Sequence, residues 1–78
     1  MNAAQTLDRN PAYILCGRQV NRGNGFMTQF EAYQHQESGE IVIERTMFKG
    51  LGEVIDFNQT EPMDADKANQ LWAAYTVH

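Results

Sequence analysis

Two residues carry side chains that could do nucleophilic chemistry together, Cys16 and His35. A histidine within hydrogen-bond reach of a cysteine can accept its proton and leave a reactive thiolate. The strand pairing derived below places these two side chains on opposite faces of a sheet, out of reach of each other. We therefore expect Cys16 to be a small buried apolar residue rather than a nucleophile.

An acid–base cluster is the second chemistry that the sequence suggests. Glu31, Tyr33, His35 and Glu44 fall on one face of neighbouring predicted strands. Carboxylates flanking an imidazole can shift pKa values toward neutrality and support proton transfer. An exposed sheet face in so small a domain has no deep pocket that excludes water, so we expect solvated polar residues. We predict that the protein is not an enzyme and has no catalytic residues.

Metal and cofactor sites are not predicted. A metal site needs three or four convergent ligands, and Cys16, His35 and His78 show no ligand spacing. The glycines at residues 50–52 lack the third glycine and the following helix of a dinucleotide-binding fingerprint. The loop at residues 21–25 could cradle an anion with its backbone amides, but glycine-rich hairpin loops also occur for turn geometry alone.

The length and composition predict one small domain. The chain has 78 residues, a net charge of −4 and a single cysteine. A lone thiol, and an N-terminus without the basic start and apolar run of a signal peptide, favour a cytoplasmic location. The longest apolar run, residues 12–16, is far shorter than the ~20 residues of a membrane helix. We expect no membrane association.

The charge distribution argues against nucleic acid as a partner. Nucleic-acid binding needs clustered Lys and Arg that displace counterions, and here six basic residues are scattered along the chain. The ten acidic residues run from Asp8 to Asp66 without packing into one stretch, which is typical of a soluble domain rather than of a nucleic-acid mimic.

The elements that position these side chains follow from periodicity. Residues 1–11 are predicted as an N-terminal arm and residues 12–78 as one domain. Strand patterns cover residues 12–20, 26–36, 41–48 and 53–57, with turns between them. An apolar stripe then predicts a helix with Asp64 as its N-cap; the stripe contains Ala65, Ala68, Leu71, Trp72 and Tyr75. The fold class is α+β, an antiparallel β-meander of three to four strands with one C-terminal α-helix packed on one face.

The register decides which side chains lie beneath the helix, because a slip of one residue inverts every side chain. A two-residue Ser38-Gly39 turn would pair Ile41 with Gln36. The core face would then contain Phe26, Phe30, Ala32, Ile41, Ile43 and Met47. A three-residue loop at 50–52 would set Lys49 opposite Glu53 and add Ile55 and Phe57 to this core.

Two loops compete for the first hairpin. A two-residue Asn24-Gly25 turn would place Tyr13, Leu15, Gly17 and Gln19 beneath the helix. A five-residue loop at 21–25 would instead place Ile14, Cys16 and Val20 there, with Arg18 at the edge of the core side. We prefer the longer loop because it pairs apolar with apolar residues.

The face opposite the helix keeps more apolar and aromatic side chains than a solvated face requires. With the longer loop, Tyr13 stands directly across from Tyr33. We predict that this face binds a partner through Tyr13, Leu15, Met27, Glu31, Tyr33, His35, Val42 and Glu44. The alternative is a mildly apolar face that the N-terminal arm or a second copy of the chain covers.

Three functions from different classes are compatible with these features. The first is a non-enzymatic protein-binding module that occupies a surface on a larger protein. The second is a dimeric enzyme or ligand-binding protein whose site is completed across the subunit interface by Glu31, His35 and Glu44. The third is a nucleic-acid binder that uses Arg18, Arg22 and Arg45.

Two resemblances bear on these hypotheses. In size and acidic composition the chain is similar to small accessory proteins of phages and mobile elements, including inhibitors of host defence or transcription machinery. The order of three strands and a helix is similar to double-stranded-RNA-binding domains. Those domains carry a lysine cluster at the start of the last helix, where this chain has Asp64-Ala65-Asp66-Lys67, so no family is assigned.

Overall fold

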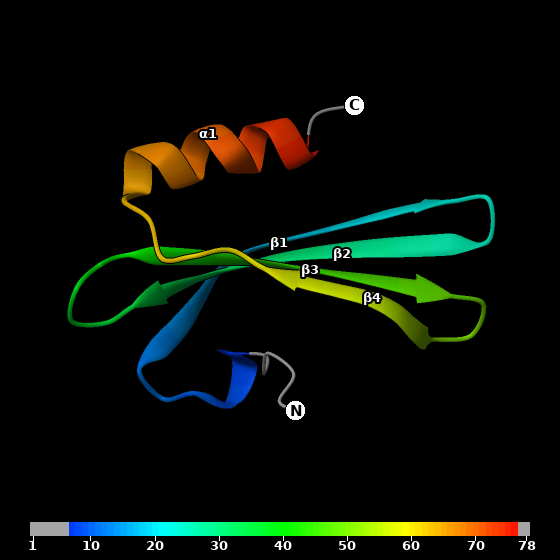
Figure 1. Cartoon of the computed structure of the whole chain (residues 1–78), viewed down its shortest axis with the longest axis horizontal. Coiled ribbons are helices and arrows are strands. Elements are labelled where there is room, and N and C mark those ends of the chain that lie inside the picture. The colour runs from blue at the N-terminus through cyan, green and yellow to red at the C-terminus, as the bar shows by residue number, and fades with distance from the viewer. Residues whose placement is uncertain (1–6, 77–78) are drawn as a thin grey trace.

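Four consecutive antiparallel strands form one sheet, and a single C-terminal α-helix lies over one side of it (Figure 1). The computed structural model describes residues 7–76. Its elements are the 3-10 helix η1 (Leu7–Arg9), the strands β1 (Tyr13–Gly23), β2 (Phe26–His35), β3 (Ile41–Lys49) and β4 (Glu53–Gln59), and the helix α1 (Ala65–Thr76). The strand order is β1-β2-β3-β4. The predicted α+β meander is confirmed, with four strands.

A two-residue turn joins β1 to β2. Gly23 pairs with Phe26, and the two residues between them, Asn24 and Gly25, have φ angles of 50° and 79°. Positive φ at both central positions is the geometry of a type I′ hairpin turn, which Asn-Gly adopts most readily. The preferred five-residue loop is therefore wrong.

A β-bulge at Cys16 explains why neither hairpin alternative was fully right. Leu15 pairs with Tyr33 and Gly17 pairs with Ala32, so Cys16 is an extra residue in β1. Before the bulge, Ile14 points to the helix side, as the longer loop predicted. After the bulge, Gly17 is on the helix side, as the shorter turn predicted.

The two-residue turn also places two side chains on the face opposite the helix. Val20 pairs with Gln29 and Arg18 pairs with Glu31, on that opposite face. The predictions that Val20 lies in the core and Arg18 on the core side are therefore wrong. Cys16 is exposed rather than buried, because a bulged residue at a sheet edge has no neighbouring strand to cover it.

The β2–β3 hairpin has the predicted faces but a different register. Gln34, not Gln36, pairs with Ile41, and the turn spans residues 36–40 rather than Ser38-Gly39 alone. The difference from the predicted register is two residues. Because side chains alternate with a period of two, Ala32 and Ile43 still face the helix.

A second bulge changes the faces of β4. Lys49 pairs with Glu53, as predicted. Beyond this pair, Phe48 opposes Val54 while Met47 opposes Asp56, so Ile55 is the extra residue. The two side chains predicted for the core therefore lie elsewhere: Ile55 is exposed, and Phe57 pairs with Thr46 on the face opposite the helix.

The core lies between α1 and the middle of the sheet. It consists of Ala32, Ile41, Ile43 and Ala68, with Met63, Leu71, Trp72 and Tyr75 packed against it. The predicted N-cap is confirmed, because the Asp64 Oδ1 accepts a hydrogen bond of 2.8 Å from the backbone N–H of Lys67. Within residues 7–76 no helix has the length and apolar character needed to cross a membrane.

Gly17 permits the close approach of α1 to β1. A Cβ atom at Gly17 would lie 3.3 Å from Cζ2 of Trp72 and 3.7 Å from the Cβ of Ala32. The first distance is shorter than an ordinary carbon–carbon contact of about 3.5–4.0 Å. A larger residue at this position must push the indole away from the sheet.

We expect Gly17→Val to lower the free energy of unfolding by about 1–3 kcal/mol, because the branched side chain overpacks against Trp72. Urea unfolding followed by the fluorescence of Trp72 measures this loss. Gly23→Val is the matched control, since a Cβ at Gly23 meets nothing within 4 Å. Equal stability of the two variants would show that Trp72 does not depend on Gly17.

Candidate functional site

The eight residues predicted to bind a partner all lie on the face opposite α1. Strand pairing brings Leu15 beside Tyr33, Tyr33 beside Val42, and Glu31 beside Glu44. Tyr13 stands across from His35 rather than from Tyr33, with ring centroids 5.0 Å apart and planes at 87°. The structure thus places all eight residues on one face of the sheet; that they bind a partner is still a prediction.

The N-terminal arm covers the centre of this face. The element η1 lies on the side of the sheet opposite α1 (Figure 1), and the backbone N–H of Leu7 donates a 2.8 Å hydrogen bond to Glu44 Oε2. Tyr33, Val42 and Glu44 are only 2%, 3% and 1% exposed. These three side chains are therefore out of reach of a partner in this conformation. The part of the predicted arm at residues 1–6 lies outside the described residues.

Glu44 is a buried carboxylate rather than the solvated polar residue that the sequence suggested. In addition to Leu7, the side-chain amide of Gln59 donates to Glu44 Oε2 at 3.0 Å. A buried charged group needs such donors, because burying it unpaired costs much free energy. Gln59 reaches Glu44 because the bulge in β4 pairs these two residues across the strands. Sequence reasoning missed this partner because the bulge leaves no clear signal.

The predicted acid–base cluster is divided among separate structural contacts. Glu31 accepts a 3.1 Å hydrogen bond from the hydroxyl of Tyr33 and lies 3.6 Å from the guanidinium of Arg18. His35 Nδ1 accepts hydrogen bonds from the backbone N–H groups of Glu37 and Ser38, each at 3.2 Å. The imidazole therefore stabilises the β2–β3 turn.

Cys16 and His35 are not brought together. Cys16 lines a small cavity on the helix side of the sheet together with Ala68 and Trp72, whereas His35 contacts Tyr13 on the other face. Nearby atoms remove part of the water around the Cys16 sulfur, and this desolvation raises the pKa of the thiol, against a smaller lowering by a backbone hydrogen bond. A raised pKa means less thiolate at neutral pH. Within residues 7–76, no three His, Cys, Asp or Glu side chains are arranged to hold a metal ion.

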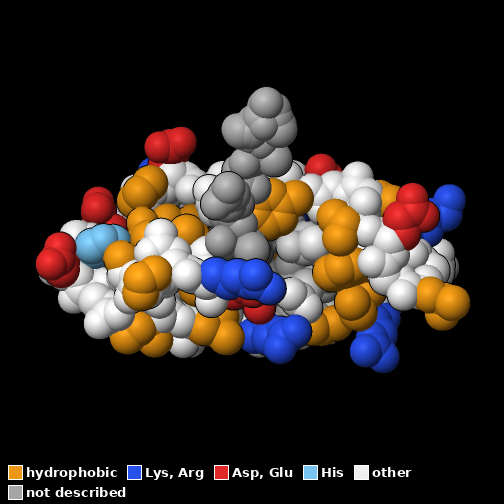
Figure 2. Space-filling view, turned by 90° about the horizontal axis from the view of Figure 1, so that it is seen from below, with side chains coloured by type: hydrophobic (Ala, Val, Ile, Leu, Met, Phe, Trp, Pro, Cys, Tyr) orange, Lys and Arg blue, Asp and Glu red, His pale blue; other side chains and the backbone are white. Residues whose placement is uncertain are grey.

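The half of the face nearest the β1–β2 and β3–β4 turns is not covered by η1. We call this half the open patch. It contains Val20, Met27, Phe48, Val54 and Phe57, as the strand pairings place them. Val20 is 37% exposed and Val54 is 56% exposed. Figure 2 shows this face: hydrophobic side chains lie along its whole length, including the end with these two turns, and basic side chains lie among them.

A shallow groove of about 550 Å³ crosses the sheet between η1 and the open patch. It is lined by Asp8, Arg18, Gln29, Glu31, Thr46, Val54 and Phe57. Among the eight residues predicted to bind a partner, only Glu31 lines this groove. Met27 is the one of the eight that belongs to the open patch. Val54 and Phe57 were missed as surface residues because the sequence assigned Phe57 to the core and could not reveal the bulge at Ile55.

Comparison with known proteins found no similar protein or structure. The chain matches no protein-family model, no curated protein and no solved structure. Its function must therefore be inferred from its own residues and contacts.

We expect Glu44→Gln to lower the free energy of unfolding by about 1 kcal/mol, because a neutral amide oxygen accepts the Leu7 N–H more weakly than a carboxylate does. Hydrogen exchange at the Leu7 amide should become faster, which reports on the arm directly. Glu53→Gln, an exposed residue on β4, is the control for loss of charge. Unchanged exchange at Leu7 would contradict the role assigned to Glu44.

The thiol of Cys16 should react slowly at neutral pH. Its raised pKa predicts that the rate of iodoacetamide alkylation rises at a higher pH in the folded protein than in the same protein unfolded in urea. Mass spectrometry of samples quenched across a pH series gives both profiles. A folded profile at lower pH than the unfolded one would reopen Cys16 as a nucleophile.

Proposed function

We propose that this chain is a non-enzymatic protein-binding module that acts by occupying a surface on a larger protein, with the open patch as its docking surface. The observation that carries the proposal is the exposure of Val20 and Val54 beside a shallow groove. Apolar side chains kept at the surface of a small domain are typical of interaction sites. An open groove suits a protein segment better than a reaction that must exclude water.

The charges around the groove indicate what kind of segment would bind. Arg18 and Arg22 project from β1 at one margin of the patch, since they pair with Glu31 and Met27 on this face. The Arg18 side chain is 58% exposed in its ion pair with Glu31, so solvent screens that pair and an incoming carboxylate can replace it. We expect a partner segment with an apolar side chain over Val54 and an acidic group near Arg18.

The composition supports a specific role and a cellular compartment for this module. The resemblance in size and charge to accessory proteins of phages and mobile elements supports an inhibitor of a host protein as the specific role. A single cysteine supports action in the reducing cytoplasm. The contacts that tie Glu44 to the arm and His35 to a turn favour binding over catalysis.

A second copy of the chain is an alternative partner, which would pair along the edge strand β1 and not on the open patch. β1 is a strand at the sheet edge, and it carries the exposed side chains of Ile14 and Leu15. Such edges pair readily with another strand. Light scattering of the isolated chain separates this case from binding to a different protein.

We expect Val54→Glu to reduce capture of a partner protein from a lysate of the native host by about tenfold or more, because binding would then bury an unpaired charge. Capture is measured with immobilised protein and quantitative mass spectrometry. Gln70→Glu adds the same charge on the exposed side of α1 and should leave capture unchanged. Equal capture by Val54→Glu and the unaltered chain would exclude the open patch as the docking surface.

A further inference from the structure

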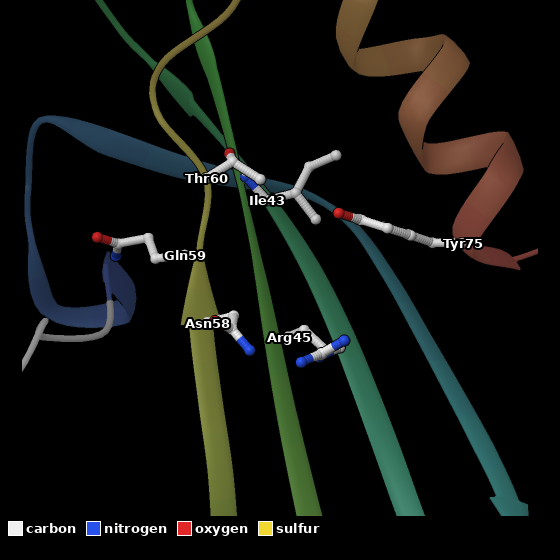
Figure 3. Close-up of a pocket in the computed structure, with 6 residues that line it drawn as sticks. All are labelled: Ile43, Arg45, Asn58, Gln59, Thr60 and Tyr75. Carbon is white, nitrogen blue, oxygen red and sulfur yellow. The ribbon is translucent and has the colours of Figure 1, made fainter.

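A second cavity lies on the helix side of the sheet, away from the open patch. It has a volume of about 340 Å³ and is lined by Ile43, Arg45, Asn58, Gln59, Thr60 and Tyr75. Figure 3 shows Arg45 and Asn58 next to each other on adjoining strands, and Tyr75 extending from α1 toward Ile43. Gln59 contributes little chemistry here, because its amide turns to Glu44 on the other face.

The polar lining of this cavity is rich in hydrogen-bond donors. The Nε atom of Arg45 is buried and has no hydrogen-bond partner in the described part of the chain. Thr60 Oγ1 accepts a 2.9 Å hydrogen bond from the backbone N–H of Ile43, which leaves its hydroxyl hydrogen free to be donated. The Tyr75 hydroxyl is a further donor at the wall. The Arg45 side chain is 38% exposed, so its guanidinium can be reached from the cavity, and a lining of donors favours a ligand that supplies acceptors.

The charge in the cavity limits which acceptor fits. Arg45 Nη2 lies 2.8 Å from Asp56 Oδ2, and the Asn58 amide donates to the same oxygen at 3.2 Å. The side chains of Arg45 and Asp56 are 38% and 46% exposed, so this ion pair is weak and uses only part of the guanidinium. One acidic group already balances one basic group, so a ligand with a single negative charge is favoured over a dianion.

We propose that this cavity binds the carboxylate of a small organic acid. The carboxylate accepts hydrogen bonds from the exposed part of the Arg45 guanidinium and from the Tyr75 hydroxyl, and the apolar part of the ligand packs on Ile43 and the Tyr75 ring. The volume is at the small end of the range for ligand pockets, about 300–1,000 Å³. This site goes beyond the protein-binding role, because it lies on the opposite side of the sheet from the open patch.

Titration with sodium benzoate, followed by NMR of the whole chain, tests the proposal. We expect saturable shifts of the Arg45 Nε–H signal and of the Thr60 amide. Benzamide has the same shape without the charge and should shift them at least about tenfold less strongly. No saturable shift with benzoate, or an equal response to benzamide, would overturn the assignment.

Variants locate the binding to this cavity. Arg45→Gln should weaken benzoate binding by about tenfold or more, whereas Lys49→Gln, which removes the same charge farther along β3, should not change it. Tyr75→Phe keeps the ring that stacks on Phe30, with centroids 5.1 Å apart, and should weaken binding several-fold by removing one donor. Binding that survives both Arg45→Gln and Tyr75→Phe would place the ligand elsewhere and refute the proposal.

Replacement of Asp56 gives a test in the opposite direction. Asp56→Asn removes the charge that competes for Arg45, so benzoate should bind several-fold more tightly. This gain cannot arise from a variant that merely unfolds. Weaker or unchanged binding by Asp56→Asn would contradict the charge argument on which the carboxylate assignment depends.

Discussion

Trp72 of α1 packs closely on Gly17 of β1, and this contact sets how near the helix lies to the sheet. The absence of a Cβ at Gly17 lets the indole approach. The two-residue β1–β2 turn sets the register that directs Gly17 toward the helix and Arg18 to the other face. The bulge at Cys16 then brings Ile14, on the far side of it, back to the helix side of the sheet.

Within residues 7–76, the helices cover only part of each face of the sheet. The helix covers the middle of one face, where Ala32 and Ile43 are buried, and η1 covers the middle of the other, where Val42 is buried. Among the described residues, no helix covers the ends of the strands at the β1–β2 and β3–β4 turns. Apolar side chains such as Val54 and Ile55 are exposed there.

Two ion pairs lie on opposite faces of the sheet. Arg18 and Glu31 line the groove beside η1, whereas Arg45 lines the cavity beside α1 and pairs with Asp56. Both arginine side chains are solvent-accessible, which leaves their guanidinium groups able to exchange partners. Glu44 differs, because the arm and Gln59 enclose its carboxylate and make it part of the fold.

Local signals were enough to predict the α+β class, a meander of three to four strands and the capped C-terminal helix, because alternation, turn residues and the stripe from Ala65 to Tyr75 can be read directly from the sequence. It also placed the eight candidate residues on one face, since a register error of two residues preserves the faces. Only tertiary contacts fix the two bulges, at Cys16 and Ile55, and the position of η1 over Glu44. A bulge is selected by packing on both sides of a sheet, and the position of the arm depends on contacts between residues far apart in the chain. Neither feature therefore leaves a local pattern in the sequence.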